Sequence, residues 1–73
     1  MNTIKFGFIG AGQISHSSAA SINSHPRATL VAAQDTNAAR LKELEAKFGV
    51  ANTYATAEEL FADNNLDAVY IAT

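Results

Sequence analysis

The sequence contains no cysteine, no tryptophan and a single proline. Without cysteine, disulfide bonds and thiolate metal sites are excluded, and cysteine usage says little about the cellular compartment. Lysine and arginine are few, five against seven acidic residues, and they are scattered among the acids. The sequence therefore argues against nucleic acid as a ligand, although it leaves room for phosphate, which helix termini bind without charged side chains.

Long hydrophobic runs are missing as well. The apolar stretches are far shorter than a membrane span, and no basic segment with an apolar stretch precedes the first strand-like run. We therefore expect no membrane segment and no secretory signal, and the cytoplasm is the default location. The 73 residues, 48% hydrophobic and 16% charged, have the composition of one small globular domain at most.

Short apolar runs alternate with helical patterns along the chain. β-Favouring residues bounded by turn residues predict four strands, at 4–9, 29–34, 52–54 and 67–73. Periodic apolar residues and helix-end signals predict three helices, at 11–24, 37–48 and 57–63. This β-α-β-α-β-α-β order predicts an α/β fold, a partial doubly wound parallel sheet of Rossmann type with right-handed crossovers.

Local signals mark the ends of these helices. The first ends before Pro26, because a residue that precedes proline avoids helical backbone angles. Gly49 is a natural stop for the second. Thr56 and Glu59 match a capping box at the start of the third.

The number of strands predicts half of a larger unit. A complete doubly wound dinucleotide domain has two halves and six strands, whereas this sequence carries the first half and the fourth strand. We interpret residues 1–73 as the N-terminal part of a dinucleotide-binding domain, with the catalytic and substrate domain absent from this chain. If the chain stands alone, its last strand exposes backbone groups, and homo-oligomers, strand exchange or aggregation are expected.

The segment Gly-Ala-Gly at residues 10–12 follows the first strand and opens the first helix. Gly10 permits a tight turn, and Gly12 has no Cβ, so that a pyrophosphate can approach the backbone at the positive end of the helix. Ser15 occupies the third small position, and its hydroxyl can bond backwards within the helix. The pattern by itself also fits an ordinary strand-to-helix turn.

The second strand ends at an acid, Asp35, about where a dinucleotide fingerprint expects one after Gly12. A carboxylate there accepts hydrogen bonds from the adenosine ribose and repels a 2′-phosphate, which favours NAD over NADP. Thr36 and Asn37 stand where an NADP-binding arginine is often found, and Arg40 lies one helical turn further. The alternative is a turn that serves packing only, with Asp35 as a solvated acid at a helix entry.

Over nearly its whole length the chain resembles the N-terminal half of the nicotinamide domain of the Gfo/Idh/MocA oxidoreductases. The resemblance is carried, in the family's order and spacing, by IKFGFIGAGQIS, HPRATLVAAQDTNAARLKELEAKFGV and TYATAEELFADNNLDAVYIAT. It implies cofactor contacts at the phosphate turn, at the ribose acid and at a strand end beside the nicotinamide. These positions are Gly10, Ala11, Gly12, Gln13, Ile14, Asp35, Ala72 and Thr73.

The resemblance implies hydride transfer between NAD(P) and a hydroxyl carbon of a sugar, polyol or related small molecule. The family's catalytic lysine, in a Glu-Lys-Pro motif, and its substrate-binding residues are not in this chain, so no catalytic residue is assigned and the chain alone is expected to be inactive. The expected partners are the dinucleotide and, through the missing domain, the substrate. A non-catalytic module that senses NAD(H) is the alternative. An S-adenosylmethionine site is a weaker idea, because Phe8 and Ile9 stand where such sites usually carry an acid.

Other polar residues have simpler interpretations. His16 and His25 are expected on a helix surface and at a helix end, and neither has a partner at metal-ligand spacing, so no metal site is predicted. The serine-rich segment 15–21 fits close packing. Tyr70 is expected in the core or against the cofactor. The predicted core also contains Phe6, Phe8, Phe48 and Phe61.

Overall fold

The computed structural model describes residues 3–71, in which four strands and three helices alternate. The strands are β1 (Ile4–Ile9), β2 (Ala28–Gln34), β3 (Asn52–Tyr54) and β4 (Ala68–Ile71). The helices are α1 (Gln13–Ser24), α2 (Ala38–Phe48) and α3 (Ala57–Phe61). The predicted order is confirmed, and most element ends are within two residues of their predicted positions. The predicted end of the last strand, at residues 72–73, lies outside the described residues.

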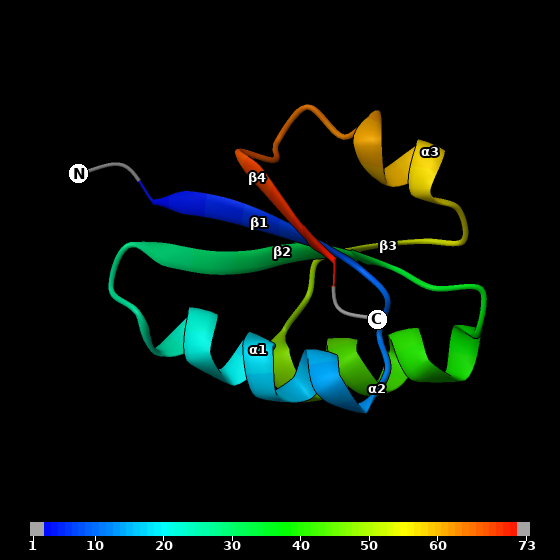
Figure 1. The fold of residues 1–73 in the computed structure, drawn as a ribbon, viewed down its shortest axis with the longest axis horizontal. Coiled ribbons are helices and arrows are strands. Elements are labelled where there is room, and N and C mark those ends of the chain that lie inside the picture. The colour runs from blue at the N-terminus through cyan, green and yellow to red at the C-terminus, as the bar shows by residue number, and fades with distance from the viewer. Residues whose placement is uncertain (1–2, 72–73) are drawn as a thin grey trace.

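The strands form one parallel sheet in the order β3-β2-β1-β4. This is the strand order of the first half of a doubly wound fold with its fourth strand added, so the predicted fold class is confirmed. Figure 1 shows α1 and α2 together on one face of the sheet and α3 on the other. Ile9 pairs with Gln34 and with Ile71, so that three carboxyl ends meet at one edge of the sheet.

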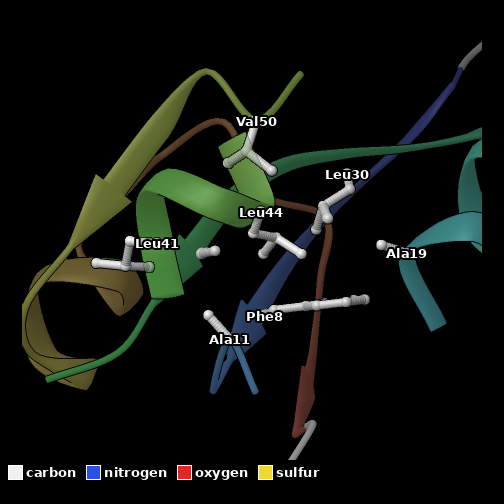
Figure 2. Packing of buried hydrophobic residues seen from close by; sticks show 8 residues of the cluster. Phe8, Ala11, Ala19, Leu30, Leu41, Leu44 and Val50 are labelled. Carbon is white, nitrogen blue, oxygen red and sulfur yellow. The ribbon is translucent and has the colours of Figure 1, made fainter. Parts of the chain in front are cut away.

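The core lies between the sheet and the α1–α2 layer (Figure 2). Phe8 and Leu44 are its largest fully buried side chains, and the small Ala19 lets α1 approach the sheet closely. On the opposite face, Leu60 of α3 is fully buried. Within residues 3–71, no helix has both the length and the apolar character that a membrane crossing requires.

The phenylalanines divide between the interior and the surface. Phe8 is fully buried, and Phe6 and Phe48 pack partly buried against the core, as predicted. The prediction for Phe61 is wrong, because its side chain is 62% exposed. Neighbouring residues of a helix point in different directions, and in α3 it is Leu60 that faces the sheet.

Three caps mark the two ends of α2 and the start of α3. Asn37 is the N-cap of α2, which therefore begins one residue later than predicted, and its side chain accepts hydrogen bonds from the N–H groups of Ala39 and Arg40. Gly49 ends α2 in the left-handed conformation, with φ at 69°. The capping box of Thr56 and Glu59 is present at α3 and confirms the prediction.

Candidate functional site

The glycine turn joins β1 to α1 at the carboxyl edge of the sheet. Gly10 has a φ of 100°, a backbone angle that residues with side chains rarely adopt. Its N–H donates to the carbonyl of Gln34 at 2.7 Å, which ties the turn to the end of β2. Gly12 is the N-cap of α1 and has no side chain to cap the first N–H groups, which a helix leaves without partners of its own. The turn therefore presents the positive end of α1.

Ser15, the third small residue of the pattern, is fully buried. Its hydroxyl donates to the carbonyl of Gly12 at 2.5 Å, and its N–H donates to the same oxygen at 3.0 Å. The backward bond expected from the sequence is therefore present. It satisfies the buried hydroxyl locally, so serine fits where glycine or alanine is usual.

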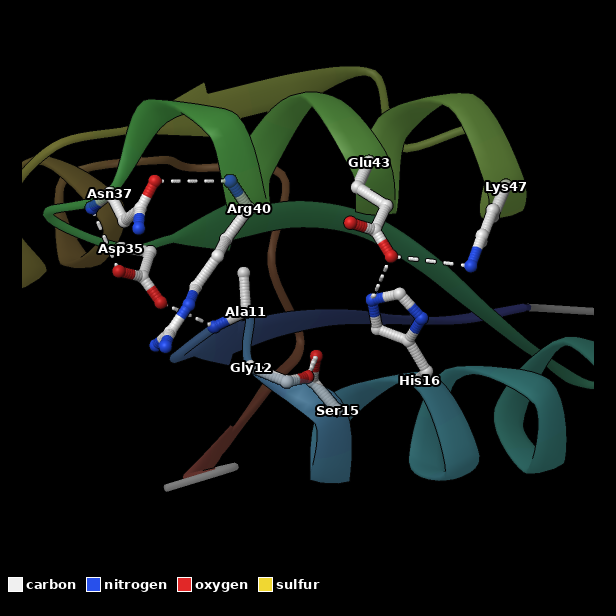
Figure 3. A network of polar contacts seen from close by, with 9 residues as sticks. All are labelled: Ala11, Gly12, Ser15, His16, Asp35, Asn37, Arg40, Glu43 and Lys47. Carbon is white, nitrogen blue, oxygen red and sulfur yellow. Dashed lines mark hydrogen bonds and ion pairs between the residues drawn. The ribbon is translucent and has the colours of Figure 1, made fainter.

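Asp35 follows β2 and uses both of its carboxylate oxygens to join two segments (Figure 3). Oδ2 accepts a hydrogen bond from the N–H of Ala11 at 2.9 Å, and Oδ1 accepts one from the N–H of Asn37 at 2.8 Å. The structure thus brings the acid and the glycine turn into direct contact. Each carboxylate oxygen can accept a further hydrogen bond, so the group can still bind a hydroxyl of a ligand.

The surroundings keep Asp35 ionised. Partial burial on its own raises the pKa of the carboxyl. Hydrogen bonds from the N–H groups of Asn37 and Ala11, together with the positive charge of Arg40, lower the pKa and outweigh burial, so it lies below the ordinary value of 3.8. At neutral pH the side chain is therefore an acceptor only.

A polar pocket of about 300 Å³ opens beside the turn. Arg40 extends from α2 toward it, and its Nη1 lies 3.7 Å from the position that a Cβ on Gly12 would occupy. Figure 3 shows the guanidinium beside Asp35 and above the turn. The lining residues are Ala11, Gly12, Gln13, His16, Arg40, Glu43 and Lys47.

His16 connects α1 with α2 rather than facing solvent freely. Its Nε2 lies 3.9 Å from a carboxylate oxygen of Glu43, and its ring meets the ring of Phe48 edge-on at a centroid distance of 5.6 Å. The same Glu43 oxygen lies 3.2 Å from Nζ of Lys47. Among residues 3–71, no three histidine, cysteine or acidic side chains gather where a metal ion could be held.

Other predicted site residues are placed as follows. Gln13 begins α1, with its side chain exposed at the pocket. Ile14 follows in the same helix. Ala72 and Thr73 lie outside the described residues. The pocket side of α2 was not predicted from the sequence, although Arg40, Glu43 and Lys47 follow helical spacing, which places them on one face.

Strand order, a glycine turn that opens α1 and an acid at the end of β2 together define the first half of a dinucleotide-binding Rossmann domain. The chain belongs to the Gfo/Idh/MocA family, whose model, described as an oxidoreductase family with an NAD-binding Rossmann fold, matches residues 4–73. The predicted family and the NAD-binding character of this domain are thereby confirmed.

The chain is similar to several dehydrogenases. It is 34% identical, over 70 residues, to the myo-inositol 2-dehydrogenase of Thermotoga maritima, covering 96% of this chain and 21% of that protein. A solved oxidoreductase from Agrobacterium radiobacter, in complex with NAD+, L-tartaric acid and magnesium, matches with a TM-score of 0.92 and 32% identity, over 99% of this chain and 21% of that one. The WlbA dehydrogenase from Bordetella pertussis, in complex with NADH and UDP-GlcNAcA, matches with a TM-score of 0.89 and 36% identity, again over 99% and 21%. The chain therefore spans 21% of the length of each of these proteins.

Proposed function

We propose that this chain is the cofactor-binding portion of an NAD-dependent oxidoreductase and that the adenosine and pyrophosphate of NAD lie against residues 10–14 and Asp35. The observation that carries the proposal is the hydrogen bond between Asp35 and the N–H of Ala11 at 2.9 Å. It makes the ribose acid and the phosphate turn one connected unit. A ligand that engages both must carry hydroxyl groups and phosphate a short distance apart, as the adenosine half of NAD does.

The residues of the turn fit separate parts of this ligand. Gly12 leaves the backbone open to a phosphate, and the first N–H groups of α1, at Gln13 and Ile14, attract an anion without a charged side chain. Gly10 adopts the positive φ that turns the chain from β1 toward α1. Ala11 is buried and gives its N–H to Asp35, so its proposed part is to support the turn.

In this proposal Asp35 binds the adenosine ribose. Asp35 is ionised and retains acceptor capacity on both oxygens, which suits the vicinal hydroxyls of an adenosine ribose. Its negative charge opposes a phosphate on the 2′ oxygen, and NAD is therefore the proposed cofactor. From the family resemblance we further propose that Ala72 and Thr73 contact the nicotinamide half.

The whole protein is proposed to transfer hydride between the nicotinamide and a hydroxyl carbon of a sugar, polyol or related molecule. Support comes from the similar proteins, which include an inositol dehydrogenase and a dehydrogenase solved with a UDP-linked sugar acid. The nicotinamide supplies the hydride chemistry when bound. Residues 1–73 bind and orient the cofactor, and the acid–base groups and the substrate site are assigned to a further domain. No observation in residues 3–71 favours the NAD(H)-sensing alternative.

Gly12→Ala tests the binding proposal with little disturbance of the fold. Gly12 has an ordinary φ of −74°, and an added Cβ would lie 3.7 Å from Arg40, which is normal van der Waals contact. The new methyl group would nevertheless occupy the approach of the pyrophosphate. We expect isothermal titration calorimetry to show NAD+ binding at least tenfold weaker, a loss of about 1.4 kcal/mol, with the unfolding midpoint within a few degrees of wild type.

Ser17→Ala, on an exposed position of the same helix, is the matched control and should bind NAD+ as wild type does. Undiminished binding by Gly12→Ala would contradict the placement of the pyrophosphate. A folded wild-type chain that does not bind NAD+ would contradict the proposed function itself.

A further inference from the structure

His16 brings a titratable base to the pocket beside the glycine turn. Histidine is the one residue type among those that line the pocket whose charge ordinarily changes between about pH 5 and pH 8. His16 lies one helical turn after Gly12 on the same face of α1, and side chains of a helix lean toward its N-terminus. The imidazole therefore leans toward the end of α1 that the glycine turn opens. The side chain is 20% exposed, so a ligand in the pocket can reach it.

The charged residues that line the pocket with His16 all belong to α2 and are Arg40, Glu43 and Lys47. Nε2 of His16 lies 3.9 Å from Oε1 of Glu43, which is longer than a hydrogen bond, and the same oxygen accepts a hydrogen bond from Nζ of Lys47 at 3.2 Å (Figure 3). Helix α1 carries no charged residue, and Asp35, after β2, is bound to two backbone N–H groups. Two cations and one anion give the pocket one net positive charge when His16 is neutral and two when it is protonated.

We propose that protonated His16 attracts the pyrophosphate of NAD and that the chain therefore takes up protons when it binds the dinucleotide. This inference rests on the proposed function, because it needs the pyrophosphate at the glycine turn. The first N–H groups of α1 offer the anion partial charges only, and an imidazolium on the same helix adds a full one. Because its contact with Glu43 is longer than a hydrogen bond, the imidazole is not held away from an incoming anion.

Linkage between the proton and the dinucleotide gives the sign of the effect. A bound pyrophosphate is anionic, so it stabilises the charged imidazole more than the neutral one. His16 therefore holds its proton more tightly in the complex than in the free chain, and by reciprocity the proton strengthens the binding of the dinucleotide. That contribution is present at low pH and is lost as the pH rises. NAD should therefore bind more tightly in mildly acidic than in mildly alkaline solution.

His25 is the other histidine of the sequence and provides a matched control. It follows the last turn of α1, about 13 Å along the helix axis from His16 at a rise of about 1.5 Å per residue. Its Nδ1 accepts a hydrogen bond from the N–H of Arg27 at 3.1 Å, at the edge of the sheet opposite the glycine turn. An effect of pH that comes from the overall charge of the chain should respond to either histidine, whereas the proposed effect depends on His16 alone.

The test measures NAD+ binding by isothermal titration calorimetry at about pH 5.5 and about pH 8, at fixed ionic strength. Buffers of different ionisation enthalpy give the number of protons taken up. Wild type should bind about fivefold more tightly at the lower pH and should take up protons. His16→Gln, which is polar but uncharged, should bind with the same affinity at both pH values and take up none. His25→Gln should behave as wild type does.

Three outcomes would overturn the inference while the proposed function stands. They are wild-type binding that does not change with pH, a pH dependence that survives in His16→Gln, and a pH dependence that disappears in His25→Gln. The first and the third need no folded His16→Gln chain. Failure of the folded wild type to bind NAD+ at either pH would overturn the proposed function together with the inference.

Discussion

Replacing Asp35 by alanine should destabilise the fold as well as weaken cofactor binding. The change removes the two carboxylate oxygens that join the glycine turn to the start of α2. One accepts from the N–H of Ala11 at 2.9 Å, and the other accepts from the N–H of Asn37 at 2.8 Å. Hydrogen bonds to a charged group contribute about 1.5–3 kcal/mol each when buried, but these are partly or wholly exposed. After allowance for solvent screening, we expect the free energy of unfolding to fall by about 1–2 kcal/mol in total.

This loss is large for so small a domain. A fall of 1–2 kcal/mol corresponds to a decrease of about 5–15 °C in the unfolding midpoint of a chain of this size, measured by circular dichroism. Asp35→Asn keeps one acceptor oxygen and should lose about half as much. Calorimetry should show weaker binding of NAD+ to both variants, because the ribose acceptor and the support of the turn are lost together. Glu45→Ala, at an exposed position of α2, removes an equal charge without such contacts and should match wild type.

Acid should reduce the difference in stability between wild type and Asp35→Ala, because protonation leaves Asp35 with one good acceptor oxygen. The pKa of Asp35 in the folded state lies below its ordinary value of 3.8. The stability that the carboxylate contributes is therefore fully present above about pH 3.8 and is lost as the pH falls through the lower, folded pKa. Equal unfolding midpoints for wild type and Asp35→Ala at pH 7, together with equal affinity for NAD+, would contradict the claim that Asp35 joins the glycine turn to the start of α2.

Three glycine and capping positions give further predictions for stability, each measured by urea denaturation. Gly10→Ala forces a side chain onto a φ of 100° and should cost about 1–3 kcal/mol, and an unchanged midpoint would count against the strained turn. In Gly7→Ala the new Cβ would lie 2.6 Å from Cδ1 of Leu66. Overpacking, partly offset by the lower entropy of the unfolded chain, should lower the free energy of unfolding by about 1–2 kcal/mol, and a stabilised variant would show that the α3 side is loosely packed. Thr56→Ala removes the hydroxyl that accepts from the N–H of Glu59 at 3.2 Å and should cost about 1 kcal/mol, whereas Thr56→Ser should not; similar losses in both would argue against the cap.

The sequence predicted the elements well because their signals are local. The capping box of Thr56 and Glu59 and the stop at Gly49 depend on residues within one helical turn, and both are present in the structure. Alternation of strands and helices was enough to predict the parallel sheet. Phe61 was misplaced because α3 has only five residues, too few for apolar spacing to show whether Leu60 or Phe61 faces the sheet.

The site was predicted in outline, but its contacts were not. The ends of β1 and β2 meet at one sheet edge, which follows from the topology and places the glycine turn near Asp35. The bond from Ala11 to Asp35 joins residues 24 positions apart and depends on the angle at which the turn leaves β1. The reach of Arg40 across to Gly12 depends on how α2 packs beside α1, which no local pattern specifies.

The most direct test of the central claim is a titration of the ¹⁵N-labelled chain with NAD+, followed by NMR amide shifts. We predict a dispersed spectrum in which the largest shifts belong to Gly10, Gly12, Gln13 and Asp35, at the carboxyl edge of the sheet. A dispersed spectrum in which these amides do not move, or in which shifts gather at the opposite edge near Ile4 and Arg27, would contradict the claim that the glycine turn and Asp35 form the dinucleotide site.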